Sequence, residues 1–91
     1  MIRDPVNFEF IDNAMTEIYD KLIFRINQKG GGIYSGPHET YGIIAEEFNK
    51  ELLDALHAND REQFRKELID IGVAVIFGMA SMDTGDASKD M

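Results

Sequence analysis

The sequence has no cysteine and no cluster of basic residues. Without cysteine, disulfides and thiolate metal sites are both excluded. A chain without disulfides fits an intracellular protein, and we expect a cytoplasmic one. The formal net charge is -8, from 17 acidic and 9 basic residues, so duplex nucleic acid is not an expected partner. An acidic protein that acts on a phosphate substrate would have to use metal ions.

Long hydrophobic runs are also missing. The longest uncharged stretch covers residues 71–82, which is too short to span a bilayer. The N-terminus lacks a signal-peptide pattern, and the chain shows neither an internal repeat nor an alternating strand pattern. We therefore expect one domain with no membrane contact. At 91 residues it would bury only roughly 60–65% of its unfolded surface, so oligomerisation would stabilise it.

Apolar spacing and helix-end signals predict an all-α fold with three helices. Asp4 and Pro5 provide a cap and a first-turn proline for the first helix, and Gly30 ends it. Asn59 and Asp60 provide the turn and the cap before the third helix. The predicted helices cover about residues 5–29, 37–58 and 61–82.

We expect residues 1–82 to form a single all-α domain and residues 83–91 to be a disordered polar tail. Between the first two helices, the glycines at 30–32 are interpreted as a helix stop and a flexible link. They do not form a nucleotide-binding phosphate loop, because that motif needs a preceding strand and a following lysine and hydroxyl residue.

The first predicted helix carries an apolar seam with heptad-like spacing, and its charged residues, including Lys21 and Arg25, are expected to face solvent. The third helix is apolar nearly all round from Ile71 onward, and three helices in one chain cannot easily cover such a helix. We therefore predict a subunit interface there, where Gly72 and Gly78 would let another helix approach closely. The expected assembly is a multi-helix bundle, either a homodimer or a homotetramer.

Four acids border the apolar faces of the second and third helices. Glu47 and Glu51 lie one turn apart on one helix, and Glu67 and Asp70 lie one turn apart on the next. Gathering carboxylates near apolar surface is unfavourable unless protons or cations neutralise them. Four converging carboxylates suit a hard divalent cation such as Mg²⁺, with Mn²⁺ as a substitute.

The same acids also have a purely structural interpretation. Lys50, Lys66 or Arg65 could pair with them as salt bridges, and spacing alone makes this the commoner outcome. The two histidines are weak catalytic candidates. His38 lies in a first helical turn and His57 near a helix end, where cap, surface and structural roles are more frequent.

The two acidic segments resemble a known signature. Glu46-Glu47 followed by another acid, and residues 67–70 (Glu-Leu-Ile-Asp) on the next helix, are similar to the E-x-x-E and E-x-x-D halves found in the MazG-type family of all-α nucleoside triphosphate pyrophosphohydrolases. Residues 38–42 and 71–75 resemble small phage-type members. The resemblance covers about residues 37–82, whereas the first helix matches only in kind.

This resemblance implies Mg²⁺-dependent hydrolysis between the α and β phosphates of a nucleoside triphosphate, which yields a monophosphate and pyrophosphate. Glu47, Glu67 and Asp70 match signature positions and would be metal ligands. Lys50 stands where the family has an acid, and a lysine cannot coordinate Mg²⁺. Glu51, one residue later, could take over as a ligand, or the change could leave a weakened or inactive site.

Other roles follow from the same hypothesis. Glu46 and Glu47 are candidates for the catalytic base, and Lys50, Lys66 and His38 are candidates for binding the substrate. The main prediction is therefore a nucleotide pyrophosphohydrolase. The alternative is a non-catalytic helical homo-oligomer that keeps the fold with a degenerate metal site. A coiled-coil interaction module is a third hypothesis, drawn from the spacing of the first helix.

Overall fold

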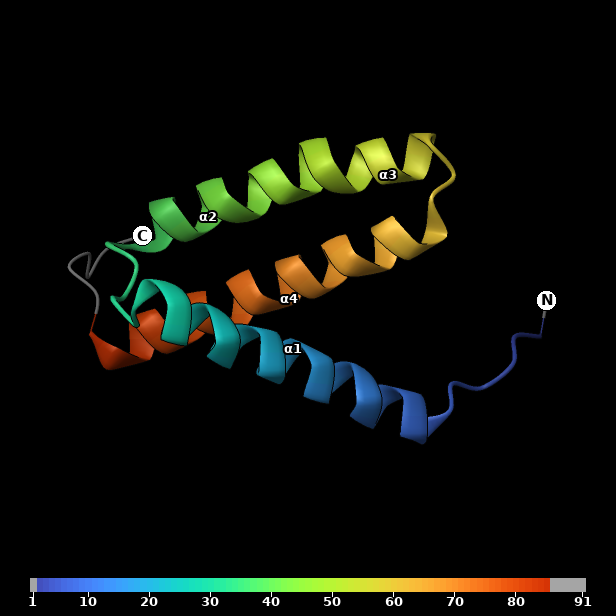
Figure 1. Ribbon diagram of the computed structural model, residues 1–91, viewed down its shortest axis with the longest axis horizontal. Helices are drawn as coiled ribbons and strands as arrows, with labels where there is room; N and C mark the ends of the chain where they lie inside the picture. The colour runs from blue at the N-terminus through green and yellow to red at the C-terminus, as the bar shows by residue number, and fades with distance from the viewer. Residues whose placement is uncertain (1, 86–91) are drawn as a thin grey trace.

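The computed structural model describes residues 2–85, which form helices joined by short segments and contain no strand (Figure 1). The three elements between residues 37 and 57 follow one another without a break and form a single rod. The elements are α1 (Phe8–Lys29), α2 (Pro37–Glu46), η1 (Glu47–Leu52), α3 (Leu53–His57) and α4 (Arg61–Thr84). Because α2, η1 and α3 make one rod, the prediction of an all-α fold with three helices is confirmed.

The start of α1 differs from the prediction. Asp4 and Pro5 precede the helix, so the expected cap-and-proline start was wrong. Asn7 is the N-cap, and its side chain accepts a hydrogen bond from the Glu9 N–H at 2.8 Å. A cap side chain of this kind satisfies an N–H that has no partner within the helix. The predicted end is confirmed, since Gly30 caps α1 with φ of 88°.

Helix α4 begins as predicted and ends slightly later. The Asp60 side chain accepts the Gln63 N–H at 3.0 Å, which makes Asp60 the N-cap. The helix continues to Thr84, two residues beyond the predicted end, and Gly85 caps it with φ of 111°. The rest of the predicted tail, residues 86–91, lies outside the described residues.

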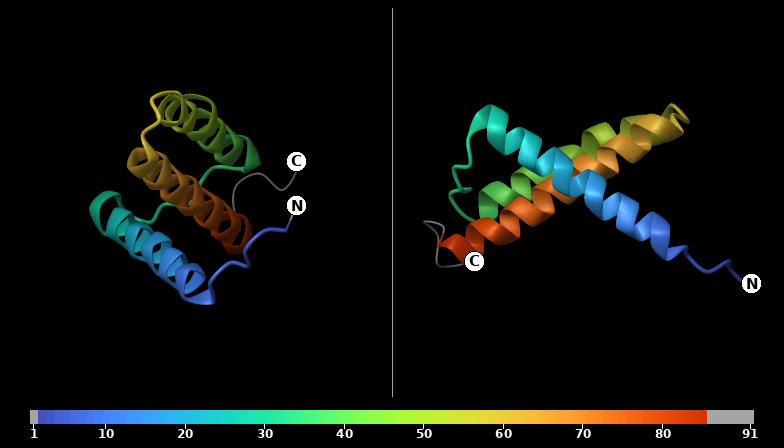
Figure 2. Two further views of the ribbon diagram at one scale, coloured as in Figure 1. Left: turned by 90° about the vertical axis from the view of Figure 1, so that its right-hand side faces the viewer. Right: turned by 60° about the horizontal axis from the view of Figure 1, so that its bottom comes forward.

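Helix α4 is the central element of the molecule. It lies between α1 on one side and the α2–η1–α3 rod on the other, and α1 crosses it at an angle (Figure 2). Gly72 faces α1 so closely that an added Cβ would lie 2.7 Å from Cδ1 of Ile18, and Gly78 similarly faces Thr40 of α2. The two glycines therefore admit helices of the same chain, where the sequence had suggested a second subunit.

The buried apolar core of this arrangement is small. It consists of Leu22, Leu52, Ala55, Val73 and Ala74. Large apolar side chains remain exposed on the outer faces of α1 and α4. Examples are Phe8 (77% exposed), Met15, Val75 and Met79 (61% exposed).

Within the described part of the chain, none of the helices has the length and apolar character needed to cross a membrane.

Candidate metal centre

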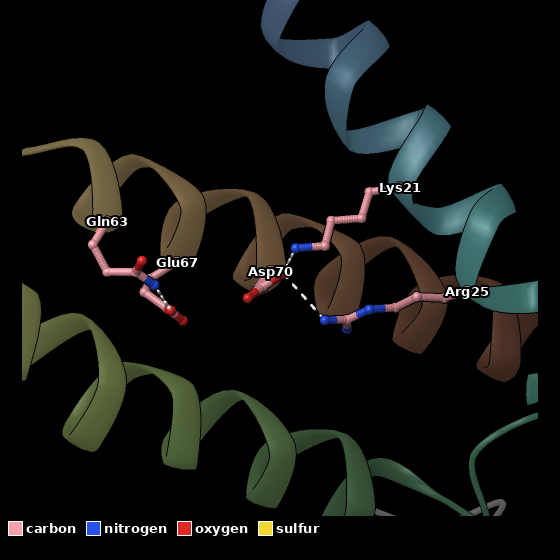
Figure 3. Close-up of polar contacts among 5 residues, drawn as sticks. All are labelled: Lys21, Arg25, Gln63, Glu67 and Asp70. Carbon is pink, nitrogen blue, oxygen red and sulfur yellow. Dashed lines mark hydrogen bonds and ion pairs between the residues drawn. The ribbon is translucent and has the colours of Figure 1, made fainter. Parts of the chain in front are cut away.

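The four acids singled out in the sequence lie together where η1 faces α4. Each of Glu47, Glu51, Glu67 and Asp70 offers a carboxylate oxygen, and the four oxygens lie within 4.8 Å of one another. Glu67 and Asp70 project from α4 toward the α2–η1–α3 rod, as Figure 3 shows. Two helices that are separate in the sequence therefore deliver one group of oxygens that could hold a metal ion.

Glu47 and Glu51 both lie on the π-helical segment η1. Its backbone bonds run from i to i+5 instead of i+4, so each turn holds more residues than an α-helical turn. Residues four apart remain neighbours on such a segment, as they are on an α-helix, and Glu51 lies beside Glu47. Lys50 is turned to the exposed surface. Such segments are rare and occur often at functional sites.

Two oxygens of the group are buried without a hydrogen-bond donor. Glu67 is only 6% exposed, and its Oε1 accepts from Nε2 of Gln63 at 2.6 Å (Figure 3). Its other oxygen, Oε2, has no partner, and neither has Oε2 of Glu47. Buried polar atoms are nearly always satisfied in folded proteins, and leaving one unpaired costs about 1–3 kcal/mol. A bound proton or cation would therefore stabilise both oxygens.

Glu47 shows the electrostatic effect of this crowding. Burial raises the pKa of its carboxyl, and hydrogen bonding and charge from Glu51, a hydrogen bond with Glu67 and the charge of Asp70 raise it further, to about 7. All of these contributions disfavour the ionised form. Without a cation, Glu47 therefore carries a proton for much of the time near neutral pH.

Among residues 2–85, Asp70 is the one member of the group that has cationic partners. Nη2 of Arg25 donates to its Oδ1 at 3.2 Å, and Nζ of Lys21 pairs with the same oxygen (Figure 3). The expectation that Lys21 and Arg25 face solvent was wrong. They lie one turn apart on α1, and the packing of α1 on α4 carries both to Asp70.

The lysines and the arginine predicted as salt-bridge partners lie elsewhere. Arg65 pairs with Glu17 of α1, which lowers the pKa of the Glu17 carboxyl, mainly through their hydrogen bond. Lys66 lies 3.7 Å from Glu62 on its own helix. Lys50 is exposed. The cations at the acidic group come from α1 instead.

The remaining candidates lie outside the group. Glu46 and His38 are both exposed, and neither contributes an oxygen or nitrogen to the cluster. Sequence reasoning missed Lys21, Arg25 and Gln63. Gln63 precedes Glu67 by one helical turn, and this spacing was the available signal for their contact.

A cavity of about 410 Å³ adjoins the acidic group. Arg25 lines it and also binds Asp70, so the two sites share a side chain. The aromatic rings of Tyr34 and Phe77 form another part of the wall. A volume of this size lies within the range of small-molecule pockets.

Comparisons of the chain with protein-family models, curated proteins and solved structures found no significant match. A fold of this kind does not determine an activity, so function has to be inferred from the side chains of the site.

Proposed function

We propose that this chain is a Mg²⁺-dependent nucleotide pyrophosphohydrolase that cleaves a nucleoside triphosphate to the monophosphate and pyrophosphate. The observation that carries the proposal is the acidic group itself. It holds four carboxylates within 4.8 Å, with two buried oxygens that lack a donor. The order of the acids along the chain, similar to the MazG-type signature, adds the reaction class.

The residues present fit a hard divalent cation. Oxygen is the ligand that Mg²⁺ and Mn²⁺ prefer, and Glu47, Glu51, Glu67 and Asp70 supply it. Two cations against four carboxylates leave a negative excess, which bound ions would neutralise. When bound, such ions polarise a phosphoryl group and stabilise the charge that develops during its hydrolysis.

The chain's own groups have distinct roles in this proposal. Glu47 is a better candidate for the catalytic base than Glu46, because Glu47 belongs to the acidic group and Glu46 lies outside it. Lys21 and Arg25 stand at the edge of the group and can contribute positive charge toward substrate phosphates. Gln63 fixes one oxygen of Glu67 and so orients the other.

We also propose that the protein is a homodimer or homotetramer. Phe8, Met15, Val75 and Met79 are exposed in the single chain, and a subunit interface would cover large apolar side chains of this kind. Sedimentation or light scattering at several concentrations tests this. A monomer at all concentrations would contradict it.

The decisive test of function is pyrophosphate release from a panel of ordinary and modified nucleoside triphosphates, with Mg²⁺, with Mn²⁺ and with a chelator. Release that requires the metal and is lost in Asp70→Asn supports the proposal. If calorimetry shows that neither metal binds and no nucleotide is cleaved, the chain is the alternative, a helical homo-oligomer with a degenerate site.

Glu51 provides a second test of the same proposal. If Glu51 replaces the acid that the resemblance places at position 50, Glu51→Gln lowers metal-dependent turnover, whereas Lys50→Gln leaves it within about twofold of the original, as expected of an exposed position. The opposite result would show that the ligand assignment on η1 is wrong: turnover lost in the Lys50 variant and unchanged in the Glu51 variant.

A further inference from the structure

The cavity beside the acidic group has an aromatic and aliphatic wall that the proposed hydrolysis does not use. Its side chains come from α1, the segment after the glycines, α2 and α4. Six of them are Arg25, Ile26, Tyr34, Ile43, Val73 and Phe77. Apart from Arg25 and Lys29, the lining contains no charged side chain, so most of the cavity suits an uncharged planar or apolar group.

The two rings of this wall are held in place. Tyr34 and Phe77 meet edge to face, with ring centroids 4.8 Å apart and an interplanar angle of 62°. The Tyr34 N–H donates to Oγ of Ser81 at 3.1 Å, and that hydroxyl donates to the Phe77 carbonyl at 2.7 Å. Ser81 is 1% exposed, so these bonds are shielded from water. The aromatic wall is thus preformed.

The cavity lies next to the acidic group and shares Arg25 with it. Ile43 precedes Glu47 by about one helical turn, and Val73 follows Asp70 by about one turn. Arg25 lies at the junction, because it lines the cavity and donates to Asp70. A molecule that spans both parts would place anionic groups near Arg25 and the carboxylates, and a planar ring against Tyr34 and Phe77.

We propose that this cavity binds the base of the nucleotide by ring packing against Tyr34 and Phe77. The proposal rests on the proposed function for the position of the phosphates, and it adds a subsite for the base. Stacking on aromatic rings tolerates different bases, since every base has a π face. The lining offers no carboxamide or carboxylate side chain to read a base edge. Purines and pyrimidines should therefore bind with affinities within about tenfold of each other.

The test uses adenosine, uridine and ribose as probes, without any metal, so that neither phosphate nor ion contributes. Titrations of the full chain are followed by ¹H–¹⁵N NMR. Adenosine and uridine should shift the amide signals of Gly32, Tyr34 and Phe77, and ribose should not.

A substitution that narrows the cavity sharpens the test. Gly32 lines it, its φ lies outside the left-handed region, and a Cβ there would meet nothing within 4 Å. Gly32→Leu should weaken adenosine binding by at least about tenfold, a loss within the range of one stacked base. Gly42→Leu is the matched control, because Gly42 also has open space around it but lies outside the lining. It should change affinity by less than about twofold.

Several outcomes would overturn the subsite. These are the absence of adenosine binding, equal binding of ribose, amide shifts confined to other helices, or no effect of Gly32→Leu in a variant whose spectrum stays folded. If Gly32→Leu does not fold, the positions of the shifts in the original chain decide. Adenosine binding without any metal-dependent pyrophosphate release would refute the proposed hydrolase activity but not the base subsite. Pyrophosphate release from ribose 5-triphosphate as fast as from a nucleoside triphosphate would refute the base subsite but not the hydrolase activity.

Discussion

The two ends of the acidic group differ in whether positively charged side chains balance their carboxylates. At one end, Asp70 has Lys21 and Arg25 as partners. At the other end, Glu47 and Glu67 each keep a buried oxygen with no donor, and the pKa of Glu47 rises to about 7. Within the described residues, lysine and arginine side chains therefore reach the acidic group only from the side that faces α1. The side between η1 and α4 is where an added cation gains the most.

The largest expected effect comes from the end that has no compensating charge. Glu67→Gln removes a buried negative charge and replaces one carboxylate oxygen by an NH₂ group. Metal-dependent turnover should fall by at least about a hundredfold, because changes to residues that only support metal ligands already cost about 10- to 100-fold. Calorimetric titration with Mn²⁺ and initial rates of pyrophosphate release measure it. Glu62→Gln, at an exposed position of the same helix, is the control and should leave both unchanged. Full activity in the Glu67 variant would show that the Glu67 carboxylate is not needed for the reaction.

A smaller effect concerns the stability of the metal-free protein. Because the pKa of Glu47 is raised from 4.5 to about 7, the folded state binds more protons than the unfolded state between these values. The free energy of unfolding should fall as pH rises from about 5 to about 7.5, by about 1–2 kcal/mol after allowance for solvent screening. For a domain of this size that lowers Tm by roughly 4–16 °C.

Variants separate Glu47 from the other acids in this measurement. Glu47→Gln should flatten the pH dependence, and Glu46→Gln, which changes an exposed residue, should not. Saturating Mg²⁺ should also reduce the fall, since an ion that binds only the folded state stabilises it. A Tm that rises with pH in the metal-free original chain would contradict the assignment of the proton to Glu47.

The smallest effect is expected at the compensated end. Lys21→Gln removes one of the two cations at Asp70, and Lys21 is partly exposed. The free energy of unfolding should fall by less than about 1 kcal/mol. Mg²⁺ affinity should rise by no more than about fivefold, because Lys21 no longer competes for Asp70. Chemical denaturation and calorimetry measure the two quantities, with Lys66→Gln as the control. A loss of Mg²⁺ affinity would mean that Lys21 supports the ion site.

Sequence patterns were sufficient for much of the fold and for the acids of the site. The caps at Gly30 and Asp60 are local signals, and both were found. The pairs of acids were visible because one helical turn separates their members. Glu51 was a suggestion from spacing, which the structure supports, whereas no propensity signals that residues 47–52 are π-helical.

Contacts between residues far apart in the chain could not be predicted from the sequence. Lys21 and Arg25 looked like solvent-facing residues of α1, and only the crossing of α1 over α4 carries them to Asp70, 45 positions or more along the chain. The seam of α1 was equally ambiguous, since Leu22 is buried and Phe8 is exposed in the single chain. Periodicity identifies an apolar face but does not identify its partner.

The central position of α4 has an evolutionary consequence. The acidic group is formed between α4 and η1, whereas the lysine and arginine that pair with Asp70 come from α1 on the other side of α4. Substitutions in α1 can therefore adjust the net charge around the site while the backbones that carry the four acids stay in place. Selection could tune affinity and ligand geometry separately, through two surfaces of one shared helix.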